Sequence, residues 1–434
     1  MTGTRRNLLL FAGVAVLFVL TAFWQSWNLS LLILNLSLLS AIMAIGVNIQ
    51  WGYAGLFSTG IVGSVALGGL AVVLMSGKPV EGAWSAGMPR IAMALAFGIA
   101  VVGLAVVLRD RLTGRWKGLI ITAVLVAGFF GYRAILDPAV LSVEANNPSQ
   151  AGHIGGFGLN SIWAWPVGAV FAAAAAWVIG KVALGLREDY LAIATLGIAE
   201  IVVTVMRNED WLDRGVKNLI DLPRPWPVPK EVDLQADPGF VQTVTGFGLD
   251  SGDFSTIFVK LIYAALFTAV LAILIWGSER ALNSPWGRMV RAIRDNEVSA
   301  EAMGKNVTFR HLQIFILGSA VVGLAGAMMT SMDGQLTPPS YTPLRFTFLI
   351  WVMVIVGGSG NNWGSILGAL LIGWLYYAVE FLGPQLMGAI TSGLPAGVLK
   401  DRLSDGAAHM RLLTLGVVLL VVLRFAPRGL IPEK

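Results

Sequence analysis

The sequence predicts an all-α fold: a polytopic integral membrane bundle of about 10–12 transmembrane helices, with glycine-rich segments that are broken or re-entrant. Of the 434 residues, 56% are hydrophobic and 13% are charged, whereas soluble domains are roughly 45–50% apolar. Apolar runs of spanning length also recur along the whole chain. The longest polar stretch, 207–254, is too short and too rich in Pro and Gly for a large independent core. We therefore expect residues 1–434 to form a single transmembrane domain.

The first apolar run, 8–23, follows Arg5 and Arg6 as in a signal peptide, but no small-residue cleavage pattern ends it. We interpret it as an uncleaved first helix. The sequence contains twelve apolar runs that we interpret as membrane spans. Two of them, 346–357 and 412–423, are shorter than a full span. The candidate spans are 8–24, 29–49, 61–76, 91–108, 118–135, 162–180, 189–206, 255–277, 312–330, 346–357, 365–383 and 412–423.

Charge predicts the orientation of these spans. With a cytoplasmic N-terminus, the inner segments hold 17 Lys and Arg and the longer outer loops hold 11, as the positive-inside rule requires. Both termini and the segment 278–311 are then cytoplasmic, and 134–161 and 207–254 are outer, periplasmic loops. In the second of these loops, four prolines between Asp221 and Pro229 exclude a regular helix. Two interpretations stay open for it: a surface for a periplasmic partner, or a plain connection.

Composition also excludes several kinds of chemistry. The chain has no Cys and three His, so it offers no disulfide, no thiolate and no predicted metal site. No stretch ends in the GK[ST] of a phosphate-binding loop, so we expect no ATP hydrolysis on this chain. Without Cys and with three scattered His, the chain gives no support for an integral-membrane enzyme, so we predict no catalytic residues. We assign the formal net charge of +5 to cytoplasmic loops rather than to nucleic-acid binding.

Two glycine-rich breaks, 52–60 and 357–364, separate apolar spans. Irregular backbone at membrane depth is tolerated only where it is buried in protein or lines a cavity. In the first break Tyr53, Ser58 and Thr59 offer hydroxyls to a solute pathway. Close helix packing without solute contact is the alternative interpretation.

Glu200 is the clearest acidic residue inside a predicted span. An intramembrane carboxylate is costly and is therefore a functional candidate, here for the solute pathway together with Thr195 of the same span. A hydrogen-bonded structural role between helices is the alternative.

The stretch Glu279 to His311 is a charged island with six Lys and Arg and four Asp and Glu. Ser284 and Pro285 are typical of a helix start, and apolar residues follow at helical spacing from Trp286 to Ile293. A second short helix, 298–303, should end at Gly304, and Thr308 should cap the next span. This segment either lies on anionic lipid or docks in a groove of a cytoplasmic partner through its apolar side.

Several motifs resemble those of branched-chain amino acid ABC transporter permeases. The most specific is SPWGRMVRAIRDNEVSAEAMGKNV at 284–307, which resembles the family's cytoplasmic coupling loop. The resemblance covers most of 29–76 and 184–431. The other motifs are GYAGLFSTG at 52–60, LREDYLAIATLGIAEIV at 186–202, GLAGAM at 323–328, GGSGNNWGSILGA at 357–369 and FAPRGLI at 425–431.

This resemblance implies a permease subunit of an ATP-driven importer in the bacterial inner membrane. It implies a second homologous permease, a periplasmic solute-binding protein, and two cytoplasmic ATPase subunits that carry ATP and Mg. Branched-chain or related amino acids are the implied solutes, with urea or short amides as alternatives. The residues it implies for ATPase coupling are Trp286, Arg288, Arg291, Ile293, Arg294, Glu301 and Gly304.

The chain departs from the family pattern at three places: the first break, residues 109–161, and the glycine-rich outer motif after the 186–202 segment, which is reduced to Arg214-Gly-Val-Lys-Asn-Leu. Leu56 and Ile61 stand where the family commonly has Gln and His, which weakens a polar role for the first break. Residues 109–161 resemble an insertion without an assigned purpose.

An ion-coupled secondary transporter or channel, with Glu200 as its ion site, is the rival class.

Overall fold

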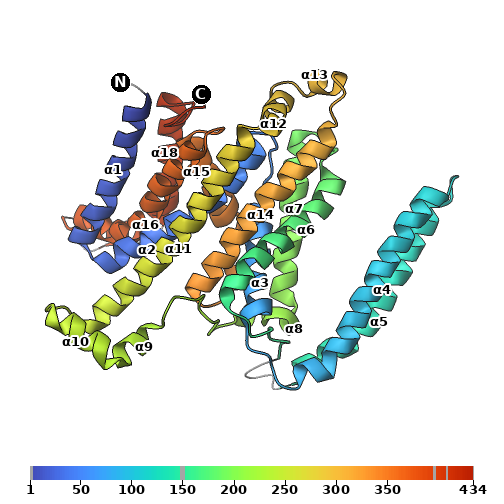
Figure 1. Cartoon of the computed structure of the whole chain (residues 1–434), viewed down its shortest axis with the longest axis horizontal. Helices are drawn as coiled ribbons and strands as arrows, with labels where there is room; N and C mark the ends of the chain where they lie inside the picture. The colour runs from blue at the N-terminus through green and yellow to red at the C-terminus, as the bar shows by residue number, and fades with distance from the viewer. Residues whose placement is uncertain (1–2, 147–151, 394–396, 407–408, 434) are drawn as a thin grey trace.

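The computed structural model describes residues 3–146, 152–393, 397–406 and 409–433 as a bundle of helices (Figure 1). Nine helices in these ranges are long and apolar enough to cross a membrane. Two further apolar helices, Ile61–Ser76 and Leu344–Gly357, are shorter. Pairing between extended segments in the described ranges is limited to two isolated β-bridges. The predicted all-α fold is confirmed.

Each of the twelve predicted spans contains a helix. These elements are α1 (Gly3–Trp24), α2 (Trp27–Val47) with η1 (Asn48–Gly52), α3 (Ile61–Ser76), α4 (Ala83–Arg111), α5 (Lys117–Glu144), η2 (Ser161–Trp163) with α6 (Ala164–Ala183), α7 (Glu188–Asn208), α11 (Ser251–Leu282), α14 (Val307–Asp333), η5 (Leu344–Phe348) with α15 (Leu349–Gly357), α16 (Asn362–Thr391) and α18 (Met410–Phe425). The shorter connecting elements are α8 (Asp210–Asp213), η3 (Gly215–Lys217), α9 (Glu231–Ala236), α10 (Pro238–Gly246), α12 (Pro285–Asp295), α13 (Glu297–Ala302), η4 (Pro338–Ser340) and α17 (Val398–Gly406).

Small residues let three helices of the core approach one another closely. A Cβ placed on Gly68 of α3 would lie 2.0 Å from the Gly323 carbonyl oxygen of α14, and one on Gly323 would lie 2.6 Å from the Gly168 oxygen of α6. Helices in lipid associate through such close packing, because lipid tails give no hydrophobic drive toward association. The α3, α6 and α14 backbones are therefore in direct contact at the centre of the bundle.

Helices α4 and α5 form a hairpin that stands apart from the bundle (Figure 1). Its two helices pack on each other, for example Gly128 against Val101. A small apolar cluster that includes Ile91, Val143 and Trp211 joins one end of it to the bundle. Helix α5 continues to Glu144, so the predicted outer loop 134–161 was wrong in its first part: residues 134–144 are helical because their apolar face packs on α4.

The two ends of the bundle carry different segments. One end, here called the α12 end, holds α12, α13, the start of α1 and the C-terminal segment (Figure 1). The opposite end, here called the α8 end, holds α8, α9 and α10. There Leu219 and Leu336 exchange backbone hydrogen bonds, and the proline-rich stretch 221–229 is free of helix, as predicted.

Candidate functional site

Helix α12 forms where the sequence predicted it. Ser284 precedes the first residue, Pro285, although its hydroxyl donates to the Ala281 oxygen rather than capping the helix. Val290 and Ile293 are 1% and 2% exposed, and Trp286 packs at the edge of the main core. The apolar side therefore packs on this chain's own bundle. The expectation that this side enters a partner's groove was wrong, because the bundle already covers it.

The face of α12 and α13 that points outward is polar, with two large apolar residues at its tip. Arg288, Glu301 and Gly304 are exposed, and Gly304 has a left-handed φ of 76° that ends the second helix. Val298 and Met303 are 77% and 79% exposed. Asn306, rather than Thr308, caps the following helix α14.

Two arginines of the segment turn toward the bundle instead. Arg291 donates to the Leu282 oxygen at 3.1 Å. The Nη1 of Arg294 donates to the Gly52 oxygen at 2.6 Å and to the Glu433 carboxylate at 3.0 Å. The Arg294 side chain is 23% exposed. Arg294 therefore connects α12 to the first glycine-rich break and to the C-terminal segment.

Both glycine-rich breaks meet at the α12 end through two asparagines. Asn48 donates to the Asn362 side-chain oxygen at 3.1 Å and accepts from the backbone N–H of Gly360 at 2.9 Å. Asn362 donates to the Glu279 carboxylate at 3.1 Å. Tyr53 is buried beside this network. It is thus a packing residue at this junction.

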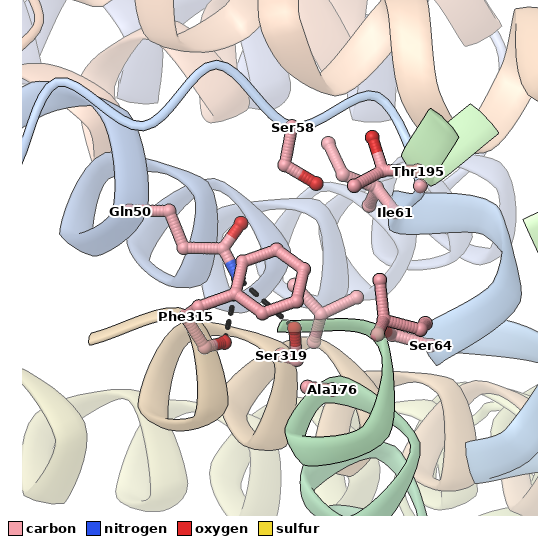
Figure 2. Close-up of a pocket in the computed structure, with 11 residues that line it drawn as sticks. Gln50, Ser58, Ile61, Ser64, Ala176, Thr195, Phe315 and Ser319 are labelled. Carbon is pink, nitrogen blue, oxygen red and sulfur yellow. Dashed lines mark hydrogen bonds between the residues drawn. The ribbon is translucent and has the colours of Figure 1, made fainter. Parts of the chain in front are cut away.

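A closed polar cavity lies deeper in the bundle, beyond the first break (Figure 2). Gln50 reaches across it and donates to the Phe315 oxygen at 2.9 Å and to the Ser319 hydroxyl at 3.0 Å. Ser58 and Thr195 also line the cavity. Its open space is about 20 Å³, room for about one water molecule, so this conformation holds no solute-sized site.

The first break is a re-entrant segment that packs against α7 and η5. The Thr59 hydroxyl donates to the Ala192 oxygen at 2.6 Å, and its N–H donates to the Thr195 hydroxyl at 3.1 Å. Thr347 donates to the Thr59 oxygen at 3.1 Å, and the Trp351 indole donates to the Ser58 oxygen. The chain thus satisfies the irregular backbone inside the bundle, as membrane depth requires.

The structure separates the five predicted pathway residues into three groups. Ser58 and Thr195 face the cavity and Thr59 adjoins it, whereas Tyr53 lies at the asparagine junction. The Glu200 side chain is 44% exposed and lies 3.6 Å from Arg207 in an ion pair. It does not line the cavity, and its pairing with Arg207 favours the structural interpretation.

Sequence reasoning missed three polar residues of the cavity: Gln50, Ser64 and Ser319. Gln50 carried a usable signal, since it is an amide near the end of an apolar span, beside the break. The two serines carried none, because serine is frequent in membrane helices that pack closely. In the described residues no cluster of three or more His, Asp or Glu side chains could hold a metal ion.

These features define a polytopic helical membrane protein in which an exposed polar segment is bonded to a break that lines an internal cavity. A model of the family "branched-chain amino acid transport system / permease component" matches residues 139–423, more than half of the chain. The chain belongs to this family.

Three relatives support this membership. A probable branched-chain amino acid transport permease protein LivM of Methanocaldococcus jannaschii is 26% identical over 406 residues, covering 91% of this chain and 90% of that protein. The high-affinity branched-chain amino acid transport system permease protein LivM of Escherichia coli is 31% identical over 216 residues, 50% of each chain. The match thus spans about half the length of the latter relative. A fructose import permease protein FrcC of Rhizobium meliloti is 30% identical over 131 residues. No solved structure gives a significant match.

Proposed function

We propose that this chain is the membrane-spanning subunit of an ATP-driven importer for branched-chain or related amino acids. The observation that carries the proposal is the bond from Arg294 of α12 to the Gly52 oxygen of the break. If partner subunits drive transport, the surface of this chain that they contact must be rigidly connected to the solute pathway. Family membership supplies the transport class.

The partners follow from the same proposal. Two cytoplasmic ATPase subunits carrying ATP and Mg would contact the exposed face of α12 and α13, with Arg288, Val298, Glu301 and Met303 as the contact residues. Exposed apolar anchors within a charged surface favour a protein partner there over a lipid surface. A second homologous permease completes the membrane part, and membrane lipid surrounds the α4–α5 hairpin.

On the opposite face we place a periplasmic binding protein. The loop 207–254 exposes Trp226 at 72% and Phe247 at 79%, which favours a contact surface over a plain connection. Under this proposal both termini lie in the cytoplasm and the transporter lies in the inner membrane of a bacterium.

Uptake of labelled leucine into proteoliposomes that hold the complete transporter tests this function. We expect import to need ATP and binding protein, and to persist when ion gradients are collapsed. Competition by urea, acetamide, fructose and ribose would then define the solute class. Import driven by an ion gradient in vesicles without the ATPase would contradict the proposal and support the rival class, with Glu200→Gln as its diagnostic variant.

A further inference from the structure

A second cavity lies between α2, α14, η5–α15 and α16, and shares no lining residue with the first. Ser40 lines it midway along the span Trp27–Gly52, and Tyr377 midway along Asn362–Thr391. The half-length apolar helix Leu344–Gly357 begins at this cavity. Short or interrupted spans of this kind form the solute sites of many transporters.

Arg345 is the charged residue among the cavity's lining residues. Its guanidinium lies 5.0 Å from the Phe346 ring centre, and Tyr377 lines the same cavity. Among the described residues no carboxylate comes within 4.0 Å of it, and the charge of Asp333 acts on it only from a greater distance. A cation inside the membrane that forms no direct ion pair is costly and marks a functional site by default.

The rest of the cavity wall is apolar apart from two hydroxyls. The Ser40 hydroxyl donates to the Leu36 oxygen at 2.9 Å, so its own oxygen remains an acceptor. The side chains that complete the wall are aliphatic or thioether groups. They include Leu36, Leu39, Met43, Leu349 and Ile350.

We propose that Arg345 binds the carboxylate of a small aliphatic amino acid during its passage, while the apolar wall receives the side chain. This inference rests on the proposed function and names the recognition chemistry within it. A guanidinium matches a carboxylate through two parallel hydrogen bonds, and Ser40 offers an acceptor to the solute's ammonium group. The open space is about 10 Å³, too little for a solute, so binding requires α15 to move away from α2 and α16.

Uptake of leucine and of leucinamide by the complete transporter separates recognition from structure, because leucinamide carries a neutral carboxamide where leucine has its carboxylate. We expect Arg345→Gln to lower kcat/KM for leucine by about tenfold to hundredfold, and to leave leucinamide nearly unchanged. Arg345→Lys should recover part of the leucine activity. The control Arg133→Gln removes an exposed arginine of the α4–α5 hairpin and should change neither. Equal losses for both solutes would assign Arg345 a structural role and overturn the proposal.

Solute protection gives a second readout that needs no transport. The chain has no native Cys, so Leu36→Cys places a single thiol at the cavity wall. Leucine should slow its reaction with a maleimide in the transporter, leucinamide should protect less, and Arg345→Gln should abolish the leucine effect. Unchanged protection in the Arg345→Gln background would overturn the proposal. If wild-type vesicles import no leucine, the proposed function fails, and the labelling result still decides whether Arg345 binds carboxylate.

Discussion

Arg294 and Gly52 are joined by a hydrogen bond of 2.6 Å from the guanidinium of α12 to the carbonyl oxygen at the start of the first glycine-rich break. Glu433 binds the same guanidinium nitrogen at 3.0 Å. Gly52 lies two residues beyond Gln50, which spans the polar cavity. One short stretch of backbone therefore connects the α12 contact with the cavity wall.

The first prediction concerns this connection. Arg294→Ala should lower ATP-driven leucine uptake by about tenfold or more while ATP hydrolysis by the complete transporter continues, since a charge-assisted contact of about 1.5–3 kcal/mol is lost. Parallel assays of uptake and phosphate release measure the ratio of the two. Arg288→Ala is the matched control: Arg288 is exposed and bonds only weakly, at 3.4 Å, to the Asn283 oxygen. Arg288→Ala should instead weaken the binding of the ATPase subunits. An unchanged ratio of uptake to ATP hydrolysis in Arg294→Ala would contradict the proposal that Arg294 connects α12 to the solute pathway.

The second prediction concerns the asparagine junction between the two breaks. Asn48→Ala leaves the Gly360 N–H and the Asn362 side chain without their buried partner, and each unsatisfied group costs about 1–3 kcal/mol. We expect a clear fall in melting temperature in detergent. Asn208→Ala is the control, because Asn208 is exposed and bonds only within its own helix. Equal melting temperatures for the two variants would show that the junction does not hold the breaks together.

The third prediction tests the glycine contacts of the core. Gly68→Ala puts a methyl group 2.0 Å from the Gly323 oxygen, a backbone atom that can move only with its helix. Overpacking of this kind costs about 1–3 kcal/mol, so thermal stability should fall. Gly103→Ala, in α4, has no atom within 4 Å of the new methyl and should be neutral or slightly stabilising, since alanine favours helix by about 1 kcal/mol. A Gly68→Ala variant as stable as Gly103→Ala would contradict the close contact.

The sequence predicted the spans well because a membrane leaves few alternatives: an apolar run of about 20 residues must be helical to satisfy its backbone. It predicted α12 from local signals alone, the Ser284–Pro285 start and the apolar spacing. It could not predict that this apolar face packs on the same chain, nor that Arg294 turns inward toward Gly52. Both depend on contacts between segments distant in the sequence, such as the 242 residues that separate Arg294 from Gly52.

The fourth prediction is a pH dependence of stability that comes from Asp213, at the α8 end. Burial raises the pKa of this carboxyl to about 7 from its ordinary 3.8, although the Gly215 N–H bonds to it. The folded state thus keeps a proton that the unfolded state releases near pH 4, so Asp213 makes the protein less stable as pH rises from about 4 to 7. Asp213→Asn retains an acceptor for Gly215 and carries no charge. It should come close to the wild type near pH 4 and melt at a higher temperature at pH 8, where the difference reaches a few kcal/mol, roughly 1.4 per pKa unit. Melting curves at both pH values measure this, and a difference independent of pH would show that Asp213 is already charged in the folded protein at pH 4.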